Sequence, residues 1–298
     1  MDAVLRAIVE PGFFQSSPVQ LAAGIGAIVA LVAAAAGVFT VIRGQAFAGE
    51  ALGDIGAAGG SSAYLVGISA IWGFLGISVA AAGVMELIGI QRVRGRDLAS
   101  GIVLGAGFGL AALFLYLGTT STSATGETVT ILFGSIFVLS SANLPLVLGF
   151  GAVAIATLAL VYRPLLLSSI SPDLAAVRGV PVRLVGLLYL LAMAVAVALA
   201  ATTIGAILST ALLVGPAASA LRLTTRPGRA IAVAGAIGVA TTWLGVLLSY
   251  DSYYWPPQHH GWPASFMIVT LVLLAYLASG AISRRRPARR GADPVLGS

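Results

Sequence analysis

The class of fold is decided by "VQLAAGIGAIVALVAAAAGVFTVIR", residues 19–43, an uncharged apolar run that ends at Arg43. A helix needs about 20 mostly apolar residues to cross the hydrocarbon core of a bilayer. Similar runs recur until the arginine cluster near the C-terminus, and 59% of the 298 residues are hydrophobic while 9% are charged. A soluble fold could not bury this much Leu, Val and Ala. The sequence therefore predicts an all-α, polytopic membrane helix bundle.

The basic residues exclude several activities. All 16 of them are Arg, so the chain lacks the Lys that a P-loop needs to hold nucleotide phosphates and the Lys that Schiff-base catalysis needs. Cysteine is also absent, which excludes disulfides, thiolate metal sites and Cys nucleophiles. The net charge of +6 is interpreted as a sign of membrane orientation, and no nucleic acid partner is expected.

The arginines at the ends of the apolar runs predict the topology, because cytoplasmic loops carry an excess of Lys and Arg. Every second loop is basic, which places the N-terminus outside and the C-terminus inside. The apolar piece at 131–143 is too short to cross and is expected at the outer face. About nine spans result, near residues 19–42, 47–68, 70–90, 98–117, 144–162, 184–200, 204–221, 230–248 and 266–282.

The segment 162–184 is basic and is expected at the cytoplasmic surface. Ser171 can cap a helix and Pro172 suits its first turn, whereas Gly179 and Pro181 are typical of a helix end. A short cytoplasmic helix at about 171–180 follows. No soluble domain is apparent, so residues 1–283 are assigned to one membrane domain and residues 284–298 to a basic, disordered cytoplasmic tail.

Two acids stand out in the second span. Glu50 and Asp54 are four residues apart, so in a helix they share a face and could offer oxygen ligands to one ion. A charge in a bilayer rarely faces lipid, so these side chains are expected to face a cavity or a partner. The alternative is that Glu50 lies near the inner interface and pairs with Arg43. The glycines that follow allow close helix packing, and "GAAGG", residues 56–60, could let the helix break.

Other polar residues are weaker candidates. His259 and His260 lie in a predicted outer loop, where they could bind a cation or simply belong to a polar loop among interfacial aromatics. The hydroxyl residues of 202–223 suit either a polar pathway or ordinary helix packing.

Three stretches, in this order, resemble the permease subunit of the ABC-3 family of metal-ion importers. "GVFTVIRGQAFAGEALGDIGAAGG", residues 37–60, is similar to the family's Phe-Leu-Gly-Asp-Ala-Leu-Ser-His-Ala stretch. "ILFGSIFVLSSANL", residues 131–144, is similar to its Leu-Phe-Gly-Asn-Ile-Leu segment. Residues 171–223 resemble it best, from "SPDLAAVRGVPVRL" to "LLVGPAASALRL".

The resemblance implies a non-catalytic translocation subunit of the bacterial cell membrane, and a divalent metal, Mn, Zn or Fe, as its cargo. The metal would meet Glu50 and Asp54, where the family has Asp and His; an oxygen in place of the nitrogen ligand favours harder ions such as Mn²⁺. The implied partners are a second permease copy, ATPase subunits that bind the ATP, and an extracytoplasmic metal-binding receptor. The implied residues of a coupling helix that meets the ATPase are Ser171, Pro172, Asp173, Leu174, Arg178 and Gly179.

Two other functions remain open at this point. A proton-coupled secondary cation transporter could use Glu50 and Asp54 directly, although such folds commonly show internal repeats and "GEALGD" is not repeated. An integral-membrane enzyme would need a convergent polar cluster at the interface, and the only two histidines lie together in one loop.

Overall fold

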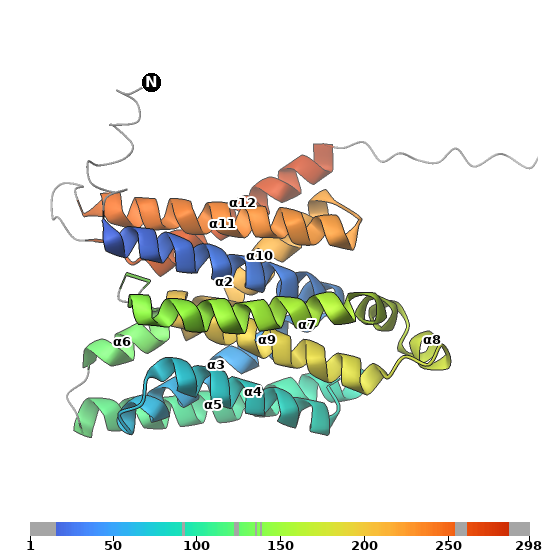
Figure 1. Ribbon diagram of the computed structural model, residues 1–298, viewed down its shortest axis with the longest axis horizontal. Coiled ribbons are helices and arrows are strands. Elements are labelled where there is room, and N and C mark those ends of the chain that lie inside the picture. Colours follow the sequence, from blue (N-terminus) through green and yellow to red (C-terminus); the bar gives the residue numbers. More distant parts are fainter. Residues whose placement is uncertain are drawn as a thin grey trace, which may run out of the picture.

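The computed structural model describes residues 16–90, 93–121, 125–134, 136–137, 139–253 and 261–285. All secondary structure in these ranges is helical (Figure 1). The helices are α2 (Ser17–Ile42), α3 (Ala46–Leu65), α4 (Ala70–Ile88), α5 (Val93–Ser121), α6 (Thr125–Phe133), the 3₁₀ helix η2 (Ser141–Asn143), α7 (Leu144–Ile170), α8 (Pro172–Val177), α9 (Val182–Ile204), α10 (Ala206–Leu223), α11 (Pro227–Ser252) and α12 (Ala264–Arg285).

The predicted all-α membrane bundle is confirmed. In the described ranges, 8 helices are long and apolar enough to cross a membrane. The predicted span that is missing from these eight is the second one, 47–68, which corresponds to α3. This helix has 20 residues but carries Glu50, Asp54 and five glycines. It is less apolar because its neighbours α4, α5, α9 and α10 cover much of it, so little of its surface has to match lipid.

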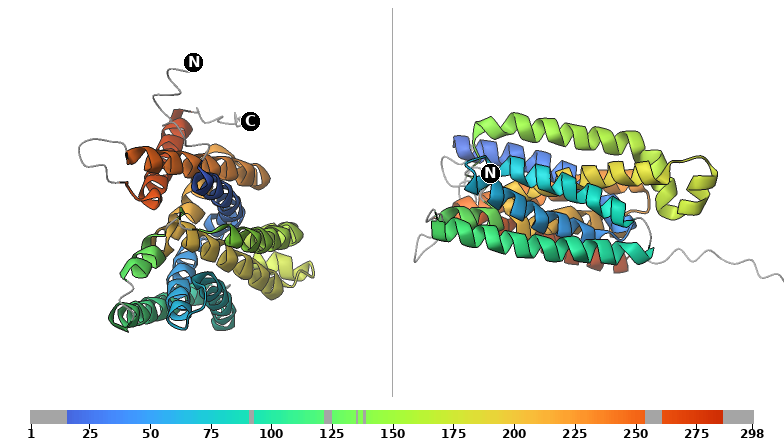
Figure 2. Two further views of the ribbon diagram at one scale, coloured as in Figure 1. Left: turned by 60° about the vertical axis from the view of Figure 1, so that its left-hand side comes forward. Right: turned by 90° about the horizontal axis from the view of Figure 1, so that it is seen from below.

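The long helices run alternately in opposite directions, as the side view shows (Figure 2). This alternation brings the described arginines to the end of the bundle where α8 lies (Figure 1). At the opposite end lie α6 and η2, which overlap the 131–143 piece and are too short to cross. The arginines concerned lie toward that end of their helices or in the short connections there: Arg43, Arg94, Arg96, Arg163, Arg178, Arg183, Arg222, Arg226, Arg229, Arg284 and Arg285.

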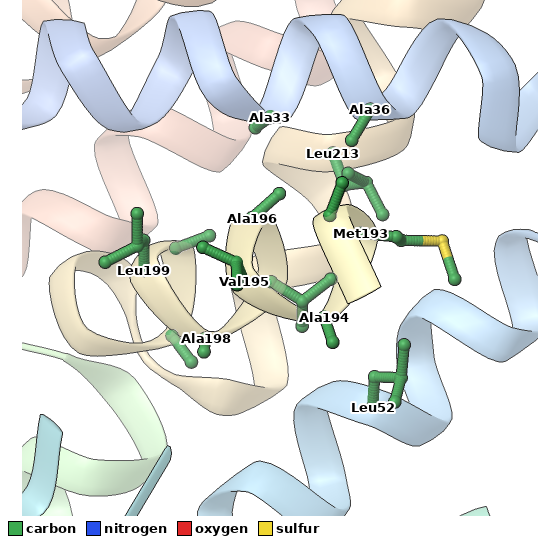
Figure 3. Packing of buried hydrophobic residues seen from close by; sticks show 14 of the residues in the cluster. Ala33, Ala36, Leu52, Met193, Ala194, Val195, Ala196, Ala198, Leu199 and Leu213 are labelled. Atoms are coloured by element: carbon green, nitrogen blue, oxygen red, sulfur yellow. The ribbon is translucent and has the colours of Figure 1, made fainter. Parts of the chain in front are cut away.

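The centre of the bundle is α9, with 78% of its span buried. It contacts α2, α3, α4, α7 and α10. Its alanines allow these neighbours to approach closely, and the larger side chains of Met193 and Leu199 fill the remaining space. Figure 3 shows this packing, with Leu52 of α3, Leu213 of α10 and two alanines of α2, Ala33 and Ala36, around α9.

Of the two roles considered for the glycines of the second span, the structure shows close packing and no break, because α3 is a continuous helix through residues 56–60. Here the glycines serve close packing. A Cβ on Gly59 would collide with the carbonyl oxygen of Gly73 in α4, and a Cβ on Gly73 would collide with that of Gly59. The two backbones are therefore in contact, which only a side chain of a single hydrogen permits.

Candidate functional site

The two acids lie on one face of α3, and this face is more exposed near the start of the helix, where it follows α2. At a rise of about 1.5 Å per residue, Glu50 lies about 6 Å and Asp54 about 12 Å from the start of the helix. Asp54 is 4% exposed and Glu50 is half-buried, while Phe47 is 50% exposed. Exposure therefore rises from the middle of α3 toward its inner end.

The short length of α6 explains this gradient. With 9 residues, α6 contacts α3, α5, α9 and α10 only near the outer end of the bundle (Figure 1). On a helix of 3.6 residues per turn, Ala57 and Ser61 share the face of Glu50 and Asp54 and are buried. At Phe47, nearer the start of α3, the described helices cover this face less, and Glu50 is only half-buried.

One carboxylate oxygen of Asp54 has no hydrogen-bond partner among the described residues. Its Oδ2 is buried and accepts no hydrogen bond from the described residues, and the same is true of Oγ1 of Thr210 in α10. A buried polar atom without a partner costs about 1–3 kcal/mol, and more if it is charged. In a native protein such an atom calls for an explanation, and a bound ion or water is one of them.

Three helices press on the turn that carries Asp54. A Cβ on Gly53 would lie 3.0 Å from Oγ of Ser209, the residue before Thr210, and 3.5 Å from Val197 of α9. On the other side, a Cβ on Gly107 of α5 would lie 2.6 Å from the backbone nitrogen of Ile55. The carboxylate of Asp54 is thus attached to a backbone segment that is fixed by packing, as a binding group requires.

Two cavities of the described protein lie away from the two acids. One of about 800 Å³ opens at the outer end among α2, α6, α11 and α12, and is lined by Phe133, Tyr250 and Trp262 among others. Another of about 280 Å³ lies between α3, α4, α6, η2 and α9 and is lined by Tyr64 and Asn143 among others. Neither is lined by Glu50 or Asp54. Within the described residues, no three His, Cys, Asp or Glu side chains come together as a metal site.

The short cytoplasmic helix is present as α8. Oγ of Ser171 accepts a hydrogen bond from the backbone N–H of Leu174 at 3.3 Å, and Asp173 lies in the first turn, which favours the helix dipole. Gly179 has a φ of +79° and its N–H donates to Ala176, so the chain turns there into the segment that leads to α9. The predicted boundaries of 171–180 agree with this start and end.

Arg43 has a larger role in the structure than the sequence indicated. It follows α2, and its Nη1 donates to Oγ of Ser168 at 3.2 Å and Oγ of Ser169 at 3.1 Å, both at the end of α7. Its Nε donates to Oε1 of Gln45 at 3.4 Å, and its guanidinium lies 5.4 Å from the centre of the Tyr189 ring in α9. The sequence carries no signal for these partners, because they come from distant parts of the chain.

Two predicted elements cannot be placed. His259 and His260 lie outside the described residues, as does the basic tail beyond Arg285.

The fold and the site define a class: a polytopic membrane helix bundle with a buried carboxylate on α3. The family follows from the sequence. The chain belongs to the ABC 3 transport family, whose profile matches residues 15–283. It is therefore a multi-pass plasma-membrane permease of an ABC transporter, and this assignment is better supported than a proton-coupled secondary transporter.

Relatives and solved structures agree with the assignment. The chain is 30% identical to "Manganese transport system membrane protein MntC" of Halalkalibacterium halodurans, over 79% of this chain and 80% of the relative. It is 31% identical to "Chelated iron transport system membrane protein YfeC" of Yersinia pestis, over 85% and 82% of the two chains. The structure "PsaBC from Streptococcus pneumoniae in complex with Fab" shares the fold, with a TM-score of 0.76, 24% identity and coverage of 94% and 95%.

Proposed function

We propose that this chain is the translocation subunit of an ATP-driven importer of a divalent metal ion, with Mn²⁺ as the favoured cargo. ATP would be bound and hydrolysed by a separate subunit, and the metal would arrive from an extracytoplasmic receptor. The observation that carries the proposal is the family match over residues 15–283, joined to a buried carboxylate oxygen without a hydrogen-bond partner on α3.

The choice of Mn²⁺ has two independent supports. The first is that manganese appears in the name of the MntC relative, although the YfeC relative is named for chelated iron. The groups offered by α3 are both carboxylates, and oxygen ligands suit Mn²⁺ better than Zn²⁺, which prefers nitrogen or sulfur. The side chain of Thr210 would supply a further oxygen on the α10 side.

Glu50 and Asp54 would form a transient site for the passing ion rather than a permanent one. One chain offers too few ligands in its described part to hold a divalent ion tightly. A second permease copy against the open face of α3 would add its own Glu50 and Asp54 and provide four carboxylates. Such a site would bind strongly in one conformation, so ATP-driven rearrangement would be needed to release the ion.

The helix α8 would be the contact with the ATPase. It lies at the basic end of the bundle, and two of its apolar side chains, Leu174 and Val177, are 46% and 86% exposed. An exposed apolar pair on a capped helix beyond the membrane spans suits docking into a groove of a partner. The chain itself would hydrolyse nothing.

The test is elemental analysis of metal-starved cells that express the permease with its ATPase and receptor. Mn²⁺, Zn²⁺ and Fe²⁺ are supplied together, and wild type is compared with Asp54→Asn and Glu50→Gln. We expect wild type to accumulate mainly Mn, and Asp54→Asn to lose at least about tenfold of this uptake, since a neutral amide loses a charge-assisted ligand worth about 1.5–3 kcal/mol.

Asp97→Asn is the matched control, because Asp97 is an exposed carboxylate near the start of α5 and is not part of the proposed ion site. It should transport like wild type at the same membrane level. Equal uptake by wild type and Asp54→Asn would remove Asp54 from the path. No metal gain by wild type in the complete complex would contradict the importer itself.

A further inference from the structure

The contacts of Arg43 connect two elements that the proposed function treats separately. On one side are Ser168 and Ser169, the last turn of α7 before Ser171 and α8. On the other side is Gln45, the residue at which α3 begins. One guanidinium therefore bridges the segment that leads into α8, the proposed ATPase contact, and the helix that carries Glu50 and Asp54.

The α7 side of this bridge is well ordered by hydrogen bonds. The hydroxyls of Ser168 and Ser169 both donate to the carbonyl oxygen of Leu165, at 3.0 and 2.6 Å, and both accept from Arg43. Just before them, Pro164 removes one backbone hydrogen bond of α7 and favours a bend there. The end of α7 is thus a short segment beyond Pro164 that is joined directly to α8 through Ser171.

The α3 side is equally direct. Only Gly44, with a φ of +62°, separates Arg43 from Gln45, and the Gln45 side chain is 3% exposed. The guanidinium also lies over Tyr189, whose hydroxyl hydrogen-bonds Oγ1 of Thr40 at 2.9 Å. A shift of Arg43 is therefore expected to displace the start of α3, because the turn between α2 and α3 is only two residues long, Arg43 and Gly44, and leads directly into the buried Gln45.

We propose that Arg43 transmits the movement of α8 to α3, and so links ATP binding on a partner subunit to the acids that meet the metal. It is a positioning residue and has no contact with the cargo. The proposal rests on the proposed function for the roles of α8 and of the acid pair. It goes beyond that function by naming the physical connection between them.

The chemistry explains why an arginine is suited to this task. A planar guanidinium donates in several fixed directions at once, here to two hydroxyls and an amide oxygen while it lies over a ring. A lysine has a single flexible ammonium and could satisfy only some of these partners. In Arg43→Gln the two serine hydroxyls keep their bonds to Leu165, so no buried donor is orphaned and the protein should still fold.

The first test compares metal import with ATP hydrolysis in vesicles that contain the complete complex. We expect Arg43→Gln to lower the number of Mn²⁺ ions imported per ATP by about fivefold or more, the lower range of typical coupling energies, with Arg43→Lys between it and wild type. Ser168→Ala combined with Ser169→Ala should act like Arg43→Gln. A parallel fall in import and hydrolysis, or an unchanged ratio, would overturn the link.

Arg222→Gln is the matched control. Arg222 lies at the same end of the bundle and makes a comparable set of contacts, donating to the hydroxyl of Tyr276 in α12 with its guanidinium 3.7 Å from the ring centre. These contacts join α10 to α12 and do not involve α3 or α8. The ratio of import to hydrolysis should therefore stay at the wild-type value.

A second test needs no metal and so separates failure of the link from failure of the importer. The chain has no cysteine, so Val177→Cys in α8 and Phe47→Cys in α3 each give one thiol at a position that is exposed in the single chain, and its labelling rate in the complex reports how closely a partner covers it. In the complex with the ATPase, a non-hydrolysable ATP analogue should change the labelling rate at both positions. With Arg43→Gln added, only the rate at position 177 should change. The link would be refuted if the nucleotide still changed the labelling rate at position 47 in the presence of Arg43→Gln. It would also be refuted if the nucleotide did not change that rate when Arg43 is intact.

Discussion

Asp54 combines features that are unfavourable in a bilayer unless a ligand compensates for them. It is almost fully buried, and one of its carboxylate oxygens has no hydrogen-bond partner in the described protein. A charge at the centre of a membrane helix costs about 2.5–3.5 kcal/mol on insertion scales. The packing of Gly53 and Gly107 against neighbouring helices prevents α3 from turning to relieve this cost. A divalent cation would compensate for it.

The nature of the donor atom should decide which metal passes. Replacing the carboxylate by imidazole in Asp54→His restores the residue that the resembled family has at this place. We expect the ratio of Zn to Mn uptake to rise by about tenfold, because nitrogen ligands favour Zn²⁺ and oxygen ligands favour Mn²⁺. Competitive uptake of both metals by the complete complex, measured as elemental content, gives this ratio.

The Zn to Mn uptake ratio of two variants, Asp54→Glu and Asp54→His, tests this expectation. Asp54→Glu keeps the oxygen donor and serves as the control, so its Zn to Mn ratio should remain like that of wild type. An unchanged ratio in Asp54→His at normal total uptake would mean that selection of the metal takes place at another point of the path.

At the scale of an element, α8 depends on one cap more than the longer helices do. It has only 6 residues, so the bond from the N–H of Leu174 to Oγ of Ser171 is a large part of what holds its first turn. Removal of such a cap costs about 1 kcal/mol. The long membrane helices are held instead by packing along their whole length.

Ser171→Ala should therefore weaken the binding of the ATPase to the permease without affecting the membrane bundle. A loss of about 1 kcal/mol of helix stability corresponds to roughly a fivefold weaker dissociation constant. Titration of the purified ATPase against the permease in detergent measures it. Ser171→Asn retains a capping side chain and should bind like wild type; equal weakening in both variants would mean that the cap is not the cause.

For the whole molecule, the distribution of arginine predicts the orientation in the membrane. The described arginines gather at the end with α8, which is expected to be cytoplasmic. In intact cells, an impermeant thiol reagent should leave Val177→Cys unlabelled and should label Val66→Cys, which is 75% exposed in the loop between α3 and α4. Permeabilised cells supply the control, in which both positions should react. Labelling of position 177 in intact cells would reverse the topology.

The sequence alone was sufficient for much of this protein. Long apolar runs must become helices in a bilayer, since every backbone N–H and C=O has to be paired within the segment, and the arginines that end them set the directions. The capped helix α8 is a local structure, so Ser171, Pro172 and Gly179 were enough to predict it. The pair Glu50 and Asp54 was visible because acids are rare in apolar segments.

Only the tertiary structure decided which surfaces meet. Residues 56–60 could have broken the helix or packed closely, and the contact of Gly59 with Gly73 of α4 determined the outcome. The buried oxygens of Asp54 and Thr210 lack hydrogen-bond partners in the described part of the chain because of how the helices pack. The bridge from Arg43 to Ser168 and Ser169 joins residues that are more than a hundred positions apart. Local sequence carries the pattern of one helix, but such contacts depend on how helices pack against each other.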